Sequence, residues 1–350
     1  MEYKYTNFIR QNIAPKGTKQ IGVYNGSKKV CNIPLGRLTP TEGKPLYSFG
    51  ALSDVHIGQP EFTTALADLR RALEFFTGTE KVNFICVCGD MTYRGTDDQL
   101  GQYQDYVDTY SPNTPVYVAA GNHETYRADG SAHTEEELRT LMKTITGNDL
   151  WYSFSRGDDV FIFVSVVYSN DANCGGQPFT VEELNWLYGV LEANRNKRCF
   201  LFQHVRPDDS CGNAFGVYKT DIWNGNKSVS FENLLKHYRN VIFFHGHSHI
   251  KFELQTKDNL ANYDNKYGMH SIHIPSLAAP RTGNPDGSGL TNIDAESQGY
   301  VVDVYEDGIR LRGRDFVTGE FLPIASYWLD TPLRTITPNT FYDSTGIIIT

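Results

Sequence analysis

Five clusters of aspartate, asparagine and histidine recur along the middle of the chain, each directly after a short apolar run. The clusters offer carboxylate, amide and imidazole groups and no cysteine thiol. This donor set suits Mn, Fe, Zn or Co better than a thiolate zinc site. The clusters are Ser53-Asp54-Val55-His56, Gly89-Asp90, Gly121-Asn122-His123-Glu124, His204 and His245-Gly246-His247-Ser248-His249.

The number of these donors predicts two metal ions rather than one. A single ion does not need so many ligands, whereas two ions that share a carboxylate would use them all. Two ions about 3.5–4 Å apart can hold both the attacking and the leaving oxygen of a phosphoryl displacement and activate a bridging water. Each residue alone is more simply a satisfied polar side chain at a strand end. The set favours a metal centre, because buried carboxylates and imidazoles need a compensating cation.

Apolar runs of strand length alternate with helix-like segments from residue 46 onward. Strands that are almost continuously hydrophobic are buried on both faces, so this alternation predicts an α/β fold. Ligands bind beyond the carboxyl ends of such strands, and the five clusters should therefore meet at one rim. Thr134 with Glu137 and Thr180 with Glu183 fit helix capping boxes. The predicted strands are 47–52, 82–87, 116–120, 161–167, 199–202 and 241–244, and the predicted helices are 61–76, 97–110, 134–145 and 181–193.

Both ends of the chain differ from this middle part in their pattern of apolar and polar residues. Two β-like runs, 20–24 and 29–33, surround an Asn25-Gly26 turn. The runs 300–305 and 309–314 predict a later hairpin, and residues 323–350 look extended and irregular. We therefore expect an N-terminal β-rich extension at 1–46, a catalytic domain at 47–316 and a C-terminal extension at 317–350.

Composition narrows the functional class. The chain has 350 residues, 40% of them apolar and 21% charged, with a net charge of −9. These values are typical of a globular protein and argue against avid, sequence-independent binding of nucleic acid. We find no apolar run of about 18 residues and no signal-peptide pattern, and so expect no membrane span and a cytoplasmic location. Six cysteines fit a reducing compartment.

The five clusters resemble, in order, the motifs of the calcineurin-like metallophosphoesterase superfamily. The resemblance covers roughly residues 47–315 and implies an α/β fold, a four-layer α/β/β/α sandwich with two mixed sheets. It places the later strands, including the hairpin near Asp307-Gly308, in the second sheet. It also implies two divalent or trivalent metal ions, chosen from Mn, Fe, Zn and Co, and a phosphorylated small-molecule or phosphodiester substrate.

The resemblance further assigns roles. Asp90 would bridge the two ions, and a metal-bridging hydroxide would attack phosphorus. His123 would contact the phosphoryl group and protonate the leaving oxygen, while Glu124 would orient His123 or raise its pKa. One ion would be held by Asp54, His56, Asp90 and His249, and the other by Asp90, Asn122, His204 and His247.

The first motif places the chain nearer the Asp-x-His branch, which is similar to class III phosphodiesterases, than the purple acid phosphatases. Gly89-Asp90-Met91-Thr92-Tyr93 does fit the purple acid phosphatase pattern, but a tyrosine ligand would compete with His56 for one position. The presence of His56 favours a diester substrate over a monoester. Arginine suits bidentate phosphate recognition, and a tyrosine can stack or simply pack. The candidate substrate contacts are Arg94, Arg206 and Tyr126.

Two other functions compete with a phosphodiesterase or phosphatase. One is a non-catalytic binding or structural module on the same fold, for example in a phage or surface assembly. The other is a nuclease of the superfamily, against which the net charge of −9 counts. The complete set of ligand residues favours an enzyme.

Overall fold

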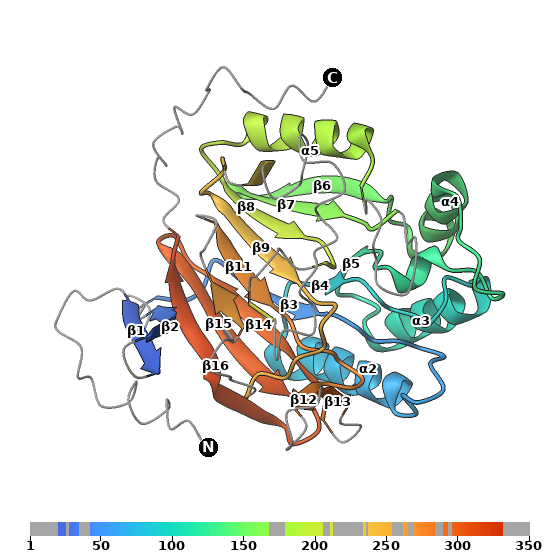
Figure 1. The fold of residues 1–350 in the computed structure, drawn as a ribbon, viewed down its shortest axis with the longest axis horizontal. Helices are drawn as coiled ribbons and strands as arrows, with labels where there is room; N and C mark the ends of the chain where they lie inside the picture. Colours follow the sequence, from blue (N-terminus) through green and yellow to red (C-terminus); the bar gives the residue numbers. More distant parts are fainter. Residues whose placement is uncertain are drawn as a thin grey trace.

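The fold is seen in a computed structural model of the chain. The structure describes residues 20–25, 28–34, 43–167, 179–205, 211–212, 234–235, 237–253, 262–264, 269–283, 290–292 and 296–331. Most of these residues belong to two six-stranded β-sheets that pack face to face (Figure 1).

The first sheet combines early and late parts of the chain. Its order is β16 (Glu320–Asp330), β15 (Gly308–Asp315), β14 (Gln298–Val304), β3 (Tyr47–Leu52), β4 (Phe84–Cys88) and β5 (Val116–Ala119). β3, β4 and β5 run parallel to one another. β14 pairs antiparallel with β3, and β15 and β16 continue the sheet antiparallel.

The second sheet is built from the middle of the chain. Its order is β10 (Tyr263–Asp264), β11 (His270–His273), β9 (Val241–His245), β8 (Arg198–Phe202), β7 (Asp159–Val164) and β6 (Trp151–Arg156). The four strands from β11 to β7 are parallel, and an antiparallel strand flanks them on each side. Both sheets are therefore mixed.

Aromatic side chains fill the space between the two sheets. Phe49 of β3 lies at the centre, with its ring centroid 5.4 Å from that of Phe161 and 5.5 Å from that of Phe200, both in edge-to-face arrangement. Such pairs add about 0.5–1.5 kcal/mol each beyond the burial of apolar area. All three rings are fully buried, so they fix how one sheet sits on the other.

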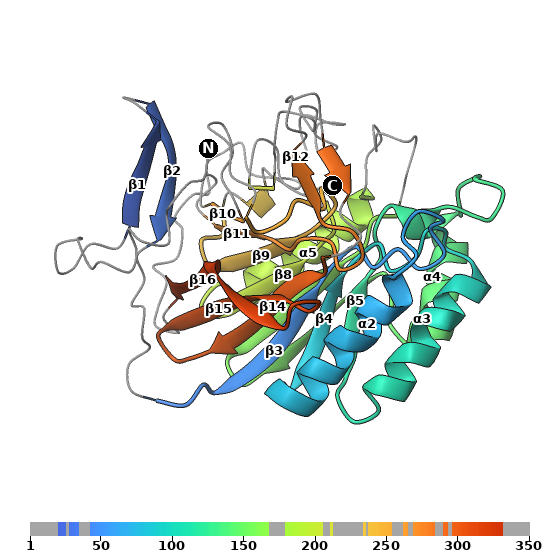
Figure 2. The same ribbon diagram turned by 90° about the horizontal axis from the view of Figure 1, so that it is seen from below.

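Helices cover the outer face of each sheet. Leu69, Leu100 and Leu138 belong to one apolar cluster with residues of the first sheet, and Leu187 to another with residues of the second. The result is the predicted four-layer α/β/β/α sandwich (Figures 1 and 2). The helices are α2 (Ala65–Glu74), which continues into the π-helical turn η1 (Phe75–Glu80), α3 (Asp97–Tyr110) and α4 (Glu135–Thr146) on the first sheet, and α5 (Val181–Ala193) on the second.

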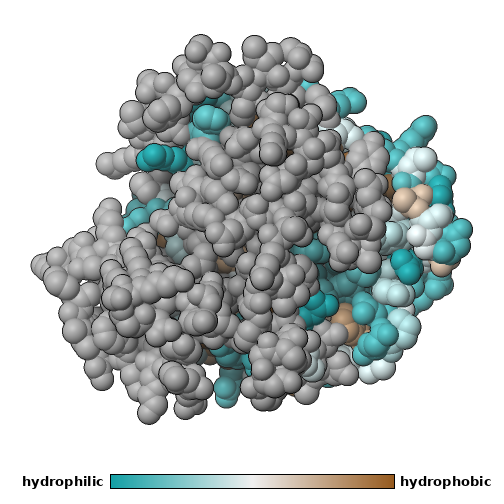
Figure 3. Space-filling model, in the orientation of Figure 1, coloured by the Kyte–Doolittle hydropathy of each residue, from teal (hydrophilic) through white to brown (hydrophobic). Residues whose placement is uncertain are grey.

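The described surface over α3 and α4 is mostly hydrophilic, with few hydrophobic residues (Figure 3). Thr134 and Glu137 form the predicted capping box at the start of α4. At α5 only half of the predicted box forms. The Thr180 hydroxyl accepts a hydrogen bond from the Glu183 N–H at 3.0 Å, but the Glu183 carboxylate is buried without a hydrogen-bond partner.

The predicted strands and helices are present, with small differences at their ends. One expectation was wrong. The hairpin near Gly308 joins the first sheet rather than the second, because Tyr300–Val304 pairs with Tyr47–Ala51. β16 was not predicted, and it extends the first sheet beyond residue 316. The division into extensions and a catalytic domain stays a prediction.

Smaller strand pairs lie outside the two main sheets. β1 (Gln20–Asn25) and β2 (Lys28–Pro34) form an antiparallel pair at the side of the main body (Figure 2), while Gly26 of the predicted turn lies outside the described residues. β12 (Arg281–Gly283) pairs with β13 (Leu290–Asn292). Among the described residues, no helix has the length and apolar character needed to cross a membrane.

Candidate metal centre

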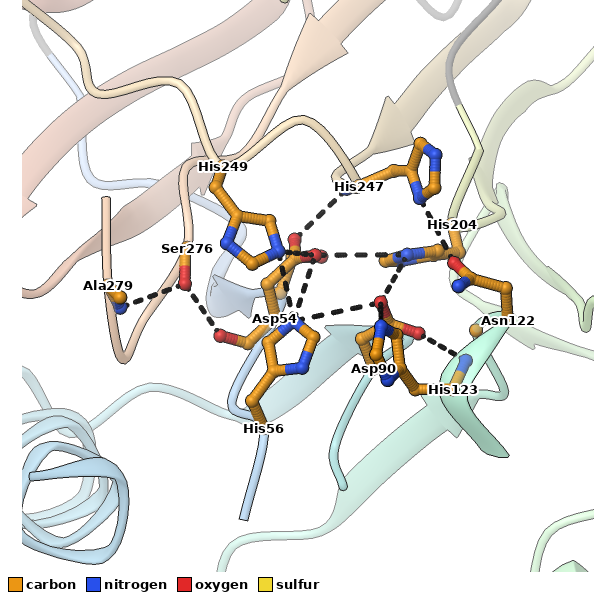
Figure 4. A network of polar contacts seen from close by, with 12 residues as sticks. Asp54, His56, Asp90, Asn122, His123, His204, His247, His249, Ser276 and Ala279 are labelled. Carbon is orange, nitrogen blue, oxygen red and sulfur yellow. Dashed lines mark hydrogen bonds and ion pairs between the residues drawn. The ribbon is translucent and has the colours of Figure 1, made fainter. Parts of the chain in front are cut away.

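The carboxyl ends of strands from both sheets meet at one polar site (Figure 4). Asp54 and His56 follow β3, Asp90 follows β4, and Asn122 with His123 follows β5. The parallel direction of these three strands brings their ends to the same edge of the first sheet.

The second sheet supplies the other imidazoles. His204 follows β8, and His247 and His249 follow β9. The rim that we expected at one sheet is therefore shared by two sheets, whose parallel strands end at the same side of the sandwich. All seven predicted ligand residues lie together there, and each is buried except His247, which is partly exposed.

A first group of donors surrounds Asp54. The Nε2 atom of His249 lies 3.0 Å from Asp54 Oδ1 and 2.9 Å from His56 Nε2. His56 Nε2 also lies 3.8 Å from Asp54 Oδ1 and 3.7 Å from Asp90 Oδ2. One donor atom from each of these four residues falls within 4.8 Å of the others, which makes the group a candidate metal site.

A second group shares Asp90 with the first. Donor atoms of Asp90, His204 and His247 also lie within 4.8 Å of one another. His204 Nε2 is 3.0 Å from Asp90 Oδ2, and His247 Nδ1 is 3.0 Å from Asn122 Oδ1. Within the described parts of the chain, these two groups are the only clusters of this kind.

The electrostatics of the site favour ionised carboxylates and mostly neutral imidazoles. Burial opposes ionisation of Asp54, but His249 and His204 outweigh it and lower its pKa well below the ordinary value. Burial lowers the pKa of His56 and of His247 to about 3 and also lowers that of His249. These imidazoles are therefore neutral near pH 7, the form in which a nitrogen lone pair can bind a metal.

His204 differs from the other imidazoles of the site, because two carboxylates raise its pKa. Burial alone would lower the pKa of His204, but Asp90 and Asp54 outweigh it and raise this pKa to about 9. The His204 Nδ1–H donates to the Cys88 carbonyl at 2.7 Å, which directs Nε2 toward the carboxylates. Without a metal, an imidazole proton thus partly offsets the negative charge that a cation would neutralise.

A second, independent observation supports metal binding by these donors. Asp54 Oδ1 and His204 Nε2 are buried, and neither makes a hydrogen bond of acceptable geometry. Buried polar atoms without partners are costly and rare in folded proteins. Their nearest polar neighbours are other candidate ligand atoms, so a shared cation would satisfy them together.

Five of the seven predicted ligand residues have a left-handed backbone. Of the six non-glycine residues with positive φ among those described, the only one outside the site is Lys81. This conformation costs non-glycine residues about 1–3 kcal/mol each, and it tends to mark functional sites. The five are Asp54 (56°), His56 (54°), Asp90 (50°), His247 (71°) and His249 (61°).

Gly246 allows the loop after β9 to approach the loop after β3. A Cβ atom at this position would lie 1.9 Å from Ser53 Oγ and 2.4 Å from Asp54 Oδ2. Without that atom, the His247 N–H can donate to Asp54 Oδ2 at 3.1 Å. This contact ties the loops of the two sheets together at the site.

His123 lies at the edge of the site, with a quarter of its side chain exposed. Its Nε2 atom is 4.0 Å from Asp90 Oδ2, and its backbone N–H donates to Asp90 Oδ1 at 2.9 Å. Its Nδ1 atom lies 3.0 Å from the Tyr93 carbonyl, which can only accept a hydrogen bond. Nδ1 therefore carries a proton, and Nε2 is the nitrogen next to the ligand cluster.

The Glu124 carboxylate makes its hydrogen bonds to residues other than His123, and the role that we expected for it toward His123 stays a prediction. This buried carboxylate accepts hydrogen bonds from the backbone N–H groups of Asp90 (3.0 Å), Thr92 (2.8 Å) and Gly121 (2.8 Å). Burial and the negative charge of Asp90 raise the pKa of Glu124, while these N–H donors oppose the rise. Through these bonds the fully buried Glu124 side chain links the loops after β4 and β5.

The sequence interpretation missed Ser276, which supports Asp54 from behind (Figure 4). Its hydroxyl donates to the Asp54 carbonyl at 2.8 Å and accepts from the Ala279 N–H at 3.0 Å. Its place shortly after β11, like that of the other clusters after their strands, was the available signal.

The predicted substrate contacts lie beside His123 where the structure describes them. The Arg94 guanidinium packs against the rings of Tyr93 and Tyr126. Both rings also lie near the His123 ring, at centroid distances of 5.7 and 6.4 Å. Arg206 lies outside the described residues.

Comparison with one solved structure supports the fold, and two others align more weakly. The purple acid phosphatase PPD1 from yellow lupin (Lupinus luteus) seeds aligns with a TM-score of 0.53 at 13% identity, over 82% of this chain and 54% of that one. The chain thus spans only about half of the lupin protein's length. A predicted phosphoesterase from Streptococcus pneumoniae TIGR4 has a TM-score of 0.37 at 10% identity, covering 81% of this chain and 97% of its own. Vps29 from Entamoeba histolytica, complexed with zinc, has a TM-score of 0.35 at 10% identity, over 81% and 99%.

Sequence comparison identifies the family. A search of curated proteins gave no significant match. A family model, calcineurin-like phosphoesterase, matches residues 47–251, which is more than half of the chain and includes every candidate ligand described above. The chain therefore belongs to the calcineurin-like phosphoesterase family.

Proposed function

We propose that the chain is a dinuclear metal-dependent phosphoesterase that hydrolyses a phosphodiester or phosphomonoester. The observation that carries this proposal is the pair of ligand groups that share Asp90. Asp54, His56, Asp90 and His249 would hold one ion. Asp90, Asn122, His204 and His247 would hold the other.

Bound metal ions would supply charge neutralisation at the phosphoryl oxygens and activation of water at neutral pH. The protein would fix the ligands. His204 is oriented by its hydrogen bond to Cys88 O, and Asp54 Oδ2 is occupied by the His247 N–H, which leaves Oδ1 for an ion. Few side-chain torsions then remain to be ordered on metal binding.

His123 would act on the leaving group. Its contact with the Tyr93 carbonyl fixes the ring, its Nε2 atom lies 4.0 Å from Asp90 Oδ2, and a quarter of its side chain is exposed. Protonated His123 can give the Nε2 proton to the departing oxygen, which otherwise leaves as a costly alkoxide. The second predicted catalytic carboxylate, Glu124, would serve catalysis only through the loops that it holds.

The test is hydrolysis of bis(p-nitrophenyl) phosphate and p-nitrophenyl phosphate by the Mn²⁺-loaded protein, with Asp90→Asn as the control. Turnover that is lost in the control supports the proposal, and the ratio of the two rates separates diester from monoester preference. Bound metal without turnover on either ester, or on a wider phosphoester panel, would contradict it and favour the non-catalytic module.

A further inference from the structure

Arg94 stands next to the candidate site without an anionic partner. Its side chain makes no ion pair within the described parts of the chain, and Asp97 and Asp98, which begin α3 close by, do not pair with it. Seven of the thirteen arginines that the structure describes do form such pairs. These are Arg70, Arg71, Arg127, Arg139, Arg195, Arg198 and Arg312.

Two tyrosines hold the Arg94 guanidinium. Its central carbon lies 4.7 Å from the ring centroid of Tyr93 and 5.2 Å from that of Tyr126. Contacts of this kind stabilise a cation and restrict the orientation of the guanidinium. The N–H groups at the edge of the guanidinium remain available for a planar oxyanion, which arginine binds through two parallel hydrogen bonds.

The backbone around Arg94 is also fixed. The Arg94 N–H donates to Gln99 Oε1 at 2.7 Å, and the Gly95 N–H donates to the Tyr126 carbonyl at 2.8 Å. A Cβ atom at Gly95 would lie 1.9 Å from the Glu124 carbonyl oxygen, so only glycine permits this approach. The loops that carry Arg94 and Tyr126 are thus locked together before any ligand arrives.

The position of this cation relative to His123 indicates what it would bind. Tyr93 and Tyr126 both lie against His123, the residue nearest the proposed leaving oxygen. Arg94 is therefore separated from His123 by no more than one aromatic ring. A charge placed here is beside the leaving group rather than among the ligands that would hold the phosphoryl group.

We propose that Arg94, held between Tyr93 and Tyr126, binds an anionic group on the leaving-group side of the substrate. The substrate is then a phosphoester whose leaving group carries its own phosphate or carboxylate. This inference rests on the proposed function for the identity of the leaving-group side. Its binding consequence can be measured without turnover.

The test compares three non-hydrolysable ligands by isothermal titration of the Mn²⁺-loaded protein. Benzylphosphonate has no second anionic group. The ligand 4-carboxybenzylphosphonate adds a carboxylate, and p-xylylenebisphosphonate adds a second phosphonate. We expect at least one charged ligand to bind about tenfold or more tightly than benzylphosphonate, the scale of a hydrogen bond between charged groups. The tighter of the two identifies the anion.

Arg94→Met should remove this preference while leaving the affinity for benzylphosphonate unchanged, and Arg94→Lys should restore only part of it. Arg70→Met is the matched control, since Arg70 also packs on a tyrosine, Tyr110, at the far end of α3. Equal binding of all three ligands, binding of none, or an equal loss for every ligand in Arg94→Met would overturn the inference. If a ligand with a second anionic group binds more tightly as expected but no phosphoester is hydrolysed, only the proposed function is contradicted.

Discussion

His56 and His249 direct their Nε2 atoms at each other across 2.9 Å, although they come from different sheets. Burial lowers the pKa of both rings, so both are neutral near pH 7 and one ring must offer a lone pair to the other. The geometry is that of two nitrogens that converge on a shared point. A metal ion at that point would replace a weak contact by two coordinate bonds.

The first prediction concerns metal stoichiometry. We expect the wild-type protein to bind two Mn²⁺ ions per chain, His249→Ala to retain one, and Asp90→Asn to bind both much more weakly, because only Asp90 belongs to both groups. Equilibrium dialysis followed by elemental analysis measures this. His237→Asn, outside the site, is the control, and equal metal content in His249→Ala and Asp90→Asn would refute the shared-ligand arrangement.

The second prediction separates His123 from the ligands. His123→Asn should keep its metal content and lose about 10²–10⁴-fold in kcat, the usual contribution of general acid catalysis. The loss should be large for phenyl phosphate and small for 2,4-dinitrophenyl phosphate, whose leaving group needs no proton. If both esters slow by the same factor, His123 does not act as the acid.

The third prediction concerns a buried ion pair that joins the sheets far from the ligands. Arg198 of β8 forms two hydrogen bonds with Asp159, at 2.8 and 2.7 Å, and Asp159 accepts a third from the Tyr47 hydroxyl of β3 at 2.5 Å. Asp159→Asn should lower the free energy of unfolding by about 3–5 kcal/mol, because it leaves the buried Arg198 charge uncompensated.

Urea unfolding of the Mn²⁺-loaded protein measures this cost. The double variant Asp159→Leu with Arg198→Met removes both charges, and it should lose less stability than Asp159→Asn alone. If Asp159→Asn lowers the free energy of unfolding by less than about 1 kcal/mol, the pair contributes no more than a surface ion pair and the prediction is wrong.

The fourth prediction concerns pH. Burial raises the pKa of Glu183 well above the ordinary value, and neither carboxylate oxygen has a hydrogen-bond partner. The folded protein therefore binds more protons here than the unfolded chain, so stability falls as pH rises above the unfolded pKa. Each unit by which the folded-state pKa exceeds the unfolded one lowers the free energy of unfolding by about 1.4 kcal/mol, at a pH above both pKa values.

Glu183→Gln removes this titration. It should unfold at a higher temperature than the wild type at pH 7, and the difference should shrink as the pH falls toward about 3, where the carboxyl is protonated in both states. Thermal unfolding across this range is the measurement. A difference that is constant with pH would show that Glu183 does not titrate as described.

Local patterns predicted the strands well and located the polar clusters that the structure brings together, because each depends on residues close in the sequence. Buried runs such as 47–52 and 241–244 have the composition of strands covered on both faces. Each ligand cluster follows such a run directly. The capping box at Thr134 is equally local and was predicted correctly.

Other features depend on contacts between distant segments and could not be predicted in this way. The pairing of β14 with β3 joins residues about 250 positions apart, and no local pattern specifies that partner. β16 contains Pro323, which lowers strand propensity but is tolerated at the edge of a sheet, where β16 lies. The direction of the Glu124 side chain depends on a short helical turn whose neighbours come from other loops.

The left-handed ligand residues also bear on how this protein would change under selection. Asp54, His56, Asp90, His247 and His249 occupy a backbone conformation in which glycine would be more stable, at least before metal binding. Replacing any of them by glycine relaxes the backbone and removes a candidate metal ligand in the same step. A library of variants selected for heat resistance alone, without metal, would therefore drift toward proteins that lack these candidate ligands, whereas selection for metal binding would keep the five side chains in place.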